Sequence, residues 1–250
     1  FIGKVRDDQL GEVFRHDIRA AGVDYHTPLA PDGPPTARCL IQVTPDAQRT
    51  MNTYLGIAAL LEPDDIDRDL VAASRIVYCE GYLWDVDIAK QAIRLAMDIA
   101  SENGNKVALT LSDSFCVERH RDEWLELIHD RVDILFANEH EIYALYGEDF
   151  DGCAREVVRH VDIACLTRSA KGSVIVTADG VIDIPAYDID KRVDTTGAGD
   201  LYAAGVLFGY SQGHDLATCG RLGSMAAAEV ITHLGARPVT PLRKLAPMVL

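Results

Sequence analysis

The stretch Asp194–Asp200, with the sequence Asp-Thr-Thr-Gly-Ala-Gly-Asp, is the part of the chain from which its fold and chemistry are best inferred. An apolar, helical pattern, Leu201 to Phe208, follows it directly. The small residues Gly197, Ala198 and Gly199 are therefore expected at a helix N-terminus. There the first backbone N–H groups have no intrahelical acceptor and the helix dipole is positive. Because Gly and Ala leave these amides uncovered, the pattern predicts a seat for an anion such as a phosphoryl group.

Asp200 follows this predicted seat within one helical turn, where a carboxylate can take a proton from an attacking hydroxyl. The alternative is that Thr195 or Thr196 only caps the helix and the glycines only form a tight turn. A cap does not need an Asp on both sides of Gly-Ala-Gly, so the pattern favours phosphoryl transfer. The stretch is neither a lysine-bearing P-loop nor a dinucleotide-binding turn.

Composition limits the class of protein. The 250 residues are 48% hydrophobic and 25% charged, which suits one soluble α/β domain with a small appendage. A net charge of −15 argues against nucleic acid or an anionic membrane as partner, since both attract clustered Lys and Arg. No apolar run approaches the ~20 residues that a membrane span needs. Six cysteines without a C-x-x-C pair indicate small buried side chains in a reducing, cytoplasmic environment.

Strand and helix patterns alternate after residue 74, which predicts a mostly parallel sheet with crossover helices, and thus an α/β fold. An antiparallel hairpin at 173–177 and 181–185 is expected at the edge of this sheet. Before it, 1–5 is expected to be a strand already under way, and 37–43 and 49–54 are expected to form a small β flap. Further strands are expected at 75–79, 106–111, 132–136 and 163–167, and helices at 85–100 with Asp85 as its cap, 117–129, 139–146, 198–210 and 215–233.

Two further motifs lie where predicted strands end. Asn138 and Glu141 are three residues apart and would share the first turn of a helix. An amide and a carboxylate there suit hydrated Mg²⁺ and phosphate oxygens, although a capping box explains the same pair. Thr167 to Gly172 is a polar turn after another strand that would place hydroxyls and amides against a nucleotide; taken alone it is a weak signal.

Together these motifs resemble the ribokinase and adenosine kinase family, the PfkB-type carbohydrate kinases. Asp194–Asp200 matches the family's C-terminal signature, and Asn138-x-x-Glu141 matches its N-x-x-E. Thr167 to Gly172 matches its T-x-G-x-x-G with Ser169 in place of the middle Gly. Residues 232–236 resemble its closing T-x-x-G-A, and residues 1–11 resemble its G-x-V-G-x-D-x-x-G, with Arg6 in place of the second Gly. The resemblance implies a ribokinase-like fold with helices on both faces of the sheet and a small β lid.

The resemblance also implies roles for individual residues. Asp200 would be the catalytic base and the amides of Gly197, Ala198 and Gly199 the anion hole. Asn138 and Glu141 would organise Mg²⁺ and the phosphates of ATP. Asp194 and the Thr196 carbonyl would belong to a monovalent-cation site, for an ion such as K⁺, that some relatives carry. The residues expected to line the nucleotide are Thr167, Ser169, Gly172 and Ser224, the last standing where relatives often have Asn or His.

By the same resemblance, the chain divides into the start of the core at 1–23, lid-associated strands at 24–56 and a nucleotide-binding, catalytic core at 57–250. Family members carry an N-terminal segment with a first strand and a G-G-x-x-x-N motif that holds much of the acceptor. That segment is not found in the 250 residues. We therefore expect either a partial sequence or a fragment that lacks much of its acceptor pocket.

The sequence thus predicts an ATP- and Mg²⁺-dependent kinase that phosphorylates a hydroxymethyl group of a sugar or nucleoside. Residues 49–56 and 110–115 resemble adenosine kinases somewhat more than ribokinases, which slightly favours an adenosine-like acceptor. A non-catalytic nucleotide-binding or regulatory protein on the same fold is the alternative. Lid strands that pair between subunits would make a homodimer, and the sequence leaves that question open.

Overall fold

The computed structural model describes residues 1–147 and 149–250. Its internal contacts divide the chain into two compact units, one made of residues 1–41 and 51–107 and the other of residues 42–50 and 108–250. Each unit is described by itself. The three-part division at 1–23, 24–56 and 57–250 stays a prediction.

The first unit holds α1 (Gln9–Ala20), α2 (Arg68–Ala73), β3 (Ile76–Glu80) and α3 (Asp87–Glu102), with short 3₁₀ turns at Gly56–Leu60, Pro63–Asp65 and Gly81–Leu83. Helix α3 begins after Val86, so the prediction that Asp85 caps it is wrong. The strand predicted at 1–5 is also wrong, because residues 1–5 form no strand and the isolated bridge that follows them joins Arg6 to Ala30. Apolar side chains of Leu61, Ile66, Val71, Ala92, Ala96 and Ile99 form one of its buried clusters.

Strands β1 (Arg38–Val43) and β2 (Arg49–Tyr54) form a separate two-stranded sheet, as predicted. Every residue of β2 is exposed. The turn between the strands is closed by the Thr44 amide, which donates to the Gln48 carbonyl over 2.8 Å. This tip, residues 42–50, belongs to the second unit, where Arg192 donates to the Asp46 carbonyl over 3.3 Å.

The main sheet has the strand order β3-β4-β5-β6-β7-β8, which confirms the predicted α/β fold. Strands β4 (Lys106–Thr110), β5 (Ile134–Asn138) and β6 (Ile163–Thr167) run parallel. Strands β7 (Ser173–Thr177) and β8 (Gly180–Ile184) complete the sheet as an antiparallel edge, as the hairpin pattern predicted. The strands β4 to β7 are largely buried, as expected for a sheet covered on both faces.

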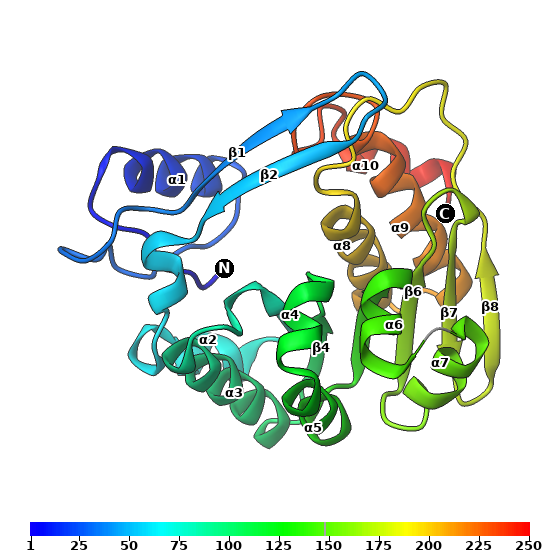
Figure 1. The fold of residues 1–250 in the computed structure, drawn as a ribbon, viewed down its shortest axis with the longest axis horizontal. Helices are drawn as coiled ribbons and strands as arrows, with labels where there is room; N and C mark the ends of the chain where they lie inside the picture. Colours follow the sequence, from blue (N-terminus) through cyan, green and yellow to red (C-terminus); the bar gives the residue numbers. More distant parts are fainter. Residues whose placement is uncertain (148) are drawn as a thin grey trace. The chain divides into compact units, whose positions relative to one another are not determined.

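Helices of the second unit cover both faces of the part of this sheet that belongs to the same unit (Figure 1). Side chains alternate along β7: Ile175 faces Gly220 of α9 (Leu216–Val230), whereas Val174 and Val176 line a cavity with α7 (Phe150–Val157). Helix α8 (Ala198–Ser211) packs closely on α9, because a Cβ at Gly205 would lie 2.5 Å from the Leu222 carbonyl oxygen. The remaining helices are α4 (Ser114–Arg119), α5 (Arg121–Arg131), α6 (Glu139–Tyr146) and α10 (Leu242–Leu245), with 3₁₀ turns at Ser169–Lys171 and Ala246–Met248.

One predicted helix is wrong in its extent. Residues 117–129 do not form a single helix, because the chain breaks at His120 between α4 and α5. Five of the six cysteines are buried, as predicted, and Cys39 is partly exposed. None of the helices within residues 1–147 and 149–250 combines the length and the apolar character that crossing a bilayer requires.

Candidate active site

Helix α8 begins without a side-chain cap. Its N-cap is Gly197, which has a left-handed backbone (φ 81°), and no side chain hydrogen-bonds to its first turn in the described part of the chain. Thr196 is turned away, since its hydroxyl donates to Asp194 Oδ1 over 2.6 Å. The alternative that Thr195 or Thr196 caps this helix is therefore wrong. The positive end of α8 is left for another acceptor.

Gly197 and Gly199 are each glycine for a different structural reason. A Cβ at Gly197 would lie 2.9 Å from the Ala236 carbonyl oxygen, so this position lacks both the space and the backbone angle for a side chain. A Cβ at Gly199 would meet no atom within 4 Å. Gly197 therefore serves packing and turn geometry, whereas Gly199 keeps the surface over the first turn open. The Ala198 amide already makes a 3.3 Å contact with the Thr195 carbonyl.

Asp200 is the third residue of α8. Within residues 1–147 and 149–250, its carboxylate accepts no recorded hydrogen bond. Although the residue is exposed, neighbouring groups take water away from the carboxylate and raise its pKa. The Arg49 guanidinium opposes this change. A carboxylate with a raised pKa beside a positive helix end is suited to accept a proton from a hydroxyl.

Arg49, at the start of β2, is a site residue that the motif reasoning missed. Its guanidinium contacts the Thr195 hydroxyl and acts on the charge of both Asp194 and Asp200. Arg49 and Thr195 are separated by 146 residues along the chain, so no local motif joins them. The only signal in the sequence was that residues 49–56 resemble adenosine kinases.

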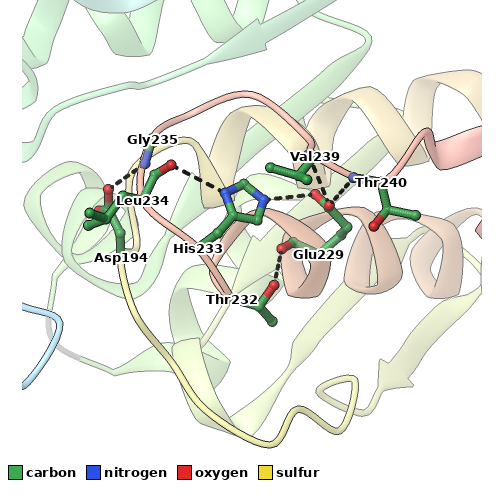
Figure 2. A network of polar contacts seen from close by, with 8 residues as sticks. All are labelled: Asp194, Glu229, Thr232, His233, Leu234, Gly235, Val239 and Thr240. Carbon is green, nitrogen blue, oxygen red and sulfur yellow. Dashed lines mark hydrogen bonds and ion pairs between the residues drawn. The ribbon is translucent and has the colours of Figure 1, made fainter.

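Asp194 ties the motif to the loop after α9 (Figure 2). The carboxylate is 2% exposed and accepts hydrogen bonds from the Thr196 amide at Oδ1 and the Gly235 amide at Oδ2, over 2.9 and 3.0 Å. Burial alone would raise the pKa of Asp194, but the hydrogen bonds from Thr196 and Gly235 outweigh it and hold the pKa below its usual value. Asp194 is thus an ionised anchor that fixes the loop carrying Ala236 against Gly197.

Glu229 holds the same loop from its other end (Figure 2). Its Oε1 accepts the amides of Val239 and Thr240 over 3.0 and 2.6 Å, and its Oε2 lies 3.3 Å from His233 Nε2. The loop after α9 is therefore held by two carboxylates, Asp194 at Gly235 and Glu229 at Val239 and Thr240. This arrangement fixes the backbone behind the N-terminus of α8.

Helix α6 begins in the opposite way, with a complete capping box. Asn138 Oδ1 accepts the Glu141 amide over 3.0 Å, and Glu141 Oε2 accepts the Asn138 amide over 2.9 Å. Asn138 Nδ2 also donates to Glu141 Oε1 over 2.7 Å. The capping interpretation of this pair is therefore correct as a description of the structure. Capping is not the only property of this pair that matters. Glu141 is only 6% exposed, so its carboxylate is also buried.

Burial raises the pKa of Glu141 to about 7, and the charges of Asp113 and Asp200 add to this effect, while hydrogen bonds from Asn138 oppose it. The charges of Asp113, the N-cap of α4, and of Asp200, on α8, thus both act on Glu141. Asp113 caps α4 by accepting the Phe115 amide over 3.1 Å, and no motif in the sequence assigned it to a metal site. A buried Glu141 carboxylate that resists ionisation is a group that a nearby hard divalent cation would stabilise.

The predicted nucleotide residues occupy a short loop and the helix behind it. Thr167 ends β6 and is the register partner of Asn138 on β5. Ser169 has a left-handed backbone (φ 53°), which explains why a Gly fits this position in the motif. A Cβ at Gly172 would lie 2.1 Å from the Ile184 carbonyl oxygen. Ser224, on α9, donates to the Pro185 carbonyl over 3.3 Å, so Gly172 and Ser224 both pack on the segment after β8.

Comparisons with known proteins show the family of the chain. A family model described as pfkB family carbohydrate kinase matches residues 1–243. The chain belongs to the pfkB family of carbohydrate kinases. It is therefore a phosphotransferase with an alcohol group as acceptor, and its α/β fold is ribokinase-like. The predicted family and class of enzyme are confirmed.

Two solved structures and one curated relative show how near this pfkB-family chain lies to particular kinases. The crystal structure of adenosine kinase from Sinorhizobium meliloti is 50% identical with a TM-score of 0.96, covering 99% of this chain and 76% of that chain. The structure of a probable sugar kinase from Rhizobium etli CFN 42 is 46% identical with a TM-score of 0.96 and the same coverage. Adenosine kinase of Saccharomyces cerevisiae is 28% identical over 260 residues, covering 98% of this chain and 74% of that protein.

Proposed function

We propose that this chain transfers the γ-phosphoryl group of ATP to a hydroxymethyl group of a sugar or nucleoside, with Asp200 as the general base. The observation that carries the proposal is the first turn of α8. That turn has no side-chain cap and bears at its third position a carboxylate whose pKa is raised because neighbouring groups take water away from it. An anion seat and a base therefore stand within one helical turn.

In the proposed reaction the acceptor hydroxyl lies against Asp200 and its oxygen attacks the γ-phosphorus in line. A new oxygen–phosphorus bond forms, the bond to the β-phosphate oxygen breaks, and ADP leaves. The hydroxyl proton passes to Asp200. The amides of Gly197 to Gly199 hold the oxygens of the transferring group, and the positive charge of Arg49 acts on the same region.

A magnesium ion is proposed to lie near Glu141. Asp113 and Glu141 offer oxygen ligands, and the raised pKa of Glu141 means that a cation nearby would favour its ionised form. When bound with ATP, Mg²⁺ would supply positive charge to the phosphate oxygens. Asn138 keeps the Glu141 carboxylate oriented through the hydrogen bonds described above.

The nucleotide is proposed to lie along Thr167, Ser169, Gly172 and Ser224. Gly172 and Ser224 support this assignment because both pack on the segment around Pro185. Thr196 and Asp194 are proposed to serve a monovalent cation such as K⁺, through the Thr196 carbonyl and the ionised Asp194 carboxylate. These oxygens suit a hard cation.

An adenosine-like nucleoside is the acceptor that we propose to test first. The S. meliloti structure is of an adenosine kinase and is 50% identical, whereas the R. etli structure is of a probable sugar kinase and is 46% identical. The difference is small, so the acceptor panel must contain both classes: adenosine and other nucleosides, ribose, fructose and simple alcohols.

The proposal is tested with Asp200→Asn, measuring ATP- and acceptor-dependent ADP release. We expect kcat to fall by about 10³-fold while ATP binding, measured by equilibrium titration, changes little. Asp188→Asn removes an exposed carboxylate from the same half of the chain and serves as the matched control. Near-normal kcat in Asp200→Asn, or an equal loss in Asp188→Asn, would contradict the assignment of Asp200.

A further inference from the structure

A side-chain contact joins α6 to the loop from Thr167 to Gly172, the two segments proposed to bind ATP. Strands β5 and β6 are parallel, and their last register pair is Asn138 with Thr167. The residues that follow, Glu139 and Arg168, therefore leave the sheet side by side. Glu139 opens α6 beside the Asn138–Glu141 pair, and Arg168 opens the loop that ends at Gly172.

Arg168 crosses from the loop to α6. Its Nε donates to Glu139 Oε1 over 3.0 Å, and its guanidinium lies over the Phe150 ring of α7, 4.1 Å from the ring centroid. Lys171, from the same loop, is 3.4 Å from Glu139 Oε1. The Arg168 and Glu139 side chains are 29% and 21% exposed, so they are shielded more than an ordinary surface pair.

The backbone makes the loop a rigid unit on which Arg168 can act. The Arg168 amide donates to the Gly172 carbonyl over 2.7 Å, and the Gly172 amide donates to the Ser169 carbonyl over 3.1 Å. Ser169 and Gly172 both have positive φ angles, 53° and 82°. A side chain that fixes Arg168 therefore fixes the whole turn from Thr167 to Gly172.

The charge of Arg168 is already compensated within the protein. The hydrogen bond from Arg168 is the largest influence that holds the pKa of Glu139 below its usual range, and Lys171 adds to it. Glu139 also lies in the first turn of α6, where the helix dipole favours a negative charge. A planar guanidinium held between a carboxylate and an aromatic ring is fixed in orientation.

We propose that Arg168 is a positioning residue that fixes the nucleotide loop to α6 through Glu139. The pair sets the spacing between the loop and the Asn138–Glu141 turn, and so the alignment of the nucleotide with its phosphates. This inference rests on the proposed function, because it assumes that the loop binds the nucleotide. In this proposal Arg168 acts through Glu139 and the loop, not on the acceptor or the transferring group.

The test compares Arg168→Gln, Glu139→Gln and the double variant with wild type, using the whole chain. Each single variant is expected to raise KM for ATP and the equilibrium dissociation constant for ADP by about five- to twentyfold, with KM for the acceptor within about twofold. The double variant is expected to be no worse than either single one, since both remove the same contact. Arg168→Glu with Glu139→Arg is expected to recover part of the affinity.

Arg155→Gln is the matched control. Arg155 is on α7, its ion pair with Asp149 spans 3.6 Å, and the two side chains are 70% and 74% exposed. This variant is expected to leave both constants within about twofold of wild type, because exposed pairs contribute little. Chemical unfolding of every variant separates a positioning effect from a general loss of stability.

Two outcomes would overturn the inference. The first is an unchanged ADP dissociation constant in Arg168→Gln. The second is an additive loss in the double variant, which would mean that the two side chains act separately. ADP binding is measured without an acceptor, so a wild-type chain that binds ADP but phosphorylates no acceptor contradicts the proposed function alone. A wild-type chain that binds no ADP contradicts both.

Discussion

Helices α6 and α8 both carry a carboxylate at the third position of the first turn, yet the two carboxylates behave differently. Glu141 of α6 turns back to the Asn138 amide and closes the helix end. Asp200 of α8 makes no such contact, because its N-cap is a left-handed glycine instead of an extended Asn. The N-cap residue therefore decides whether a helix end satisfies itself or stays open to a ligand.

The two helix ends also differ in how their hydrogen-bonding groups are used. The α6 end uses its hydrogen-bonding groups internally, and burial of Glu141 leaves a carboxylate whose pKa of about 7 makes it sensitive to a nearby cation. The α8 end keeps its positive dipole unsatisfied, which costs stability and gives a place for phosphate oxygens. The proposed metal-binding turn is thus the closed one, and the proposed phosphoryl-binding turn is the open one.

Among glycine substitutions in the first turn of α8, the largest effect is expected from Gly197→Ala, which disrupts the open end. The added Cβ would meet the Ala236 backbone and the residue would keep a strained φ of 81°, so the loop or the helix start must move. We expect phosphorylation to fall by at least about 100-fold and the free energy of unfolding to fall by about 2–4 kcal/mol. Both are measured, by steady-state rates and by urea unfolding.

Gly213→Ala is the control for this change. Gly213 also has a positive φ, 80°, but a Cβ there would meet nothing within 4 Å. It should cost only the conformational penalty, about 1 kcal/mol, and leave kcat unchanged. If the two variants lose equal stability, the packing of Gly197 on Ala236 has no importance.

Gly199→Ala is expected to have a smaller effect, and on activity only. Its Cβ would meet open space, and Ala is the better helix former, so the free energy of unfolding should stay the same or rise by up to about 1 kcal/mol. The methyl group would cover the amide surface of the first turn and lower kcat by roughly 10- to 100-fold. A stable variant with wild-type kcat would show that this surface does not hold the transferring group.

Local patterns predicted much of this architecture. The bounds of β6, β7 and α6 agree with those expected from short apolar runs and from Asn138 as a cap. Helix α7 was missed, because it includes Gly152, a poor helix former. The arrangement around Asp200 was only partly predictable. Arg49 reaches Thr195 across 146 residues, and Asp113 acts on Glu141 from another helix, so both depend on long-range packing that no motif encodes.

Glu141→Gln tests the closed end of α6 through the pH dependence of the free energy of unfolding. The folded-state pKa of Glu141, about 7, is above the ordinary value of 4.5, so ionised Glu141 is disfavoured on folding. Its contribution to stability is full below about pH 4.5 and is lost as pH rises through about 7. Glu141→Gln should remove this slope and be more stable than wild type at pH 8 by roughly 2 kcal/mol without Mg²⁺.

The ionisation of Glu141 also predicts how Mg²⁺ changes the stability of the wild-type chain. Mg²⁺ is expected to raise the urea midpoint of wild type at about pH 8, where Glu141 is ionised, more than at about pH 5, and to have little effect on Glu141→Gln. Glu118→Gln, an exposed carboxylate of α4, is the control and should keep the wild-type response. An equal Mg²⁺ effect in Glu141→Gln would remove Glu141 from the proposed metal site.

The smallest effect is expected from Asn138→Ser, which separates capping from ligand binding at the closed end. Ser is as good an N-cap as Asn, so the Glu141 amide keeps its acceptor and the free energy of unfolding should stay within about 0.5 kcal/mol of wild type. Ser cannot make the bond that Asn138 Nδ2 donates to Glu141 Oε1. If Asn138 orients Glu141 toward Mg²⁺ and the phosphates, the Mg²⁺ concentration for half-maximal rate rises about three- to tenfold.

Asn138→Ala should add a cap loss of about 1 kcal/mol to the same kinetic change. Wild-type kinetics in Asn138→Ser, with a stability loss in Asn138→Ala alone, would mean that Asn138 only caps α6 and that the metal is held by the carboxylates without it.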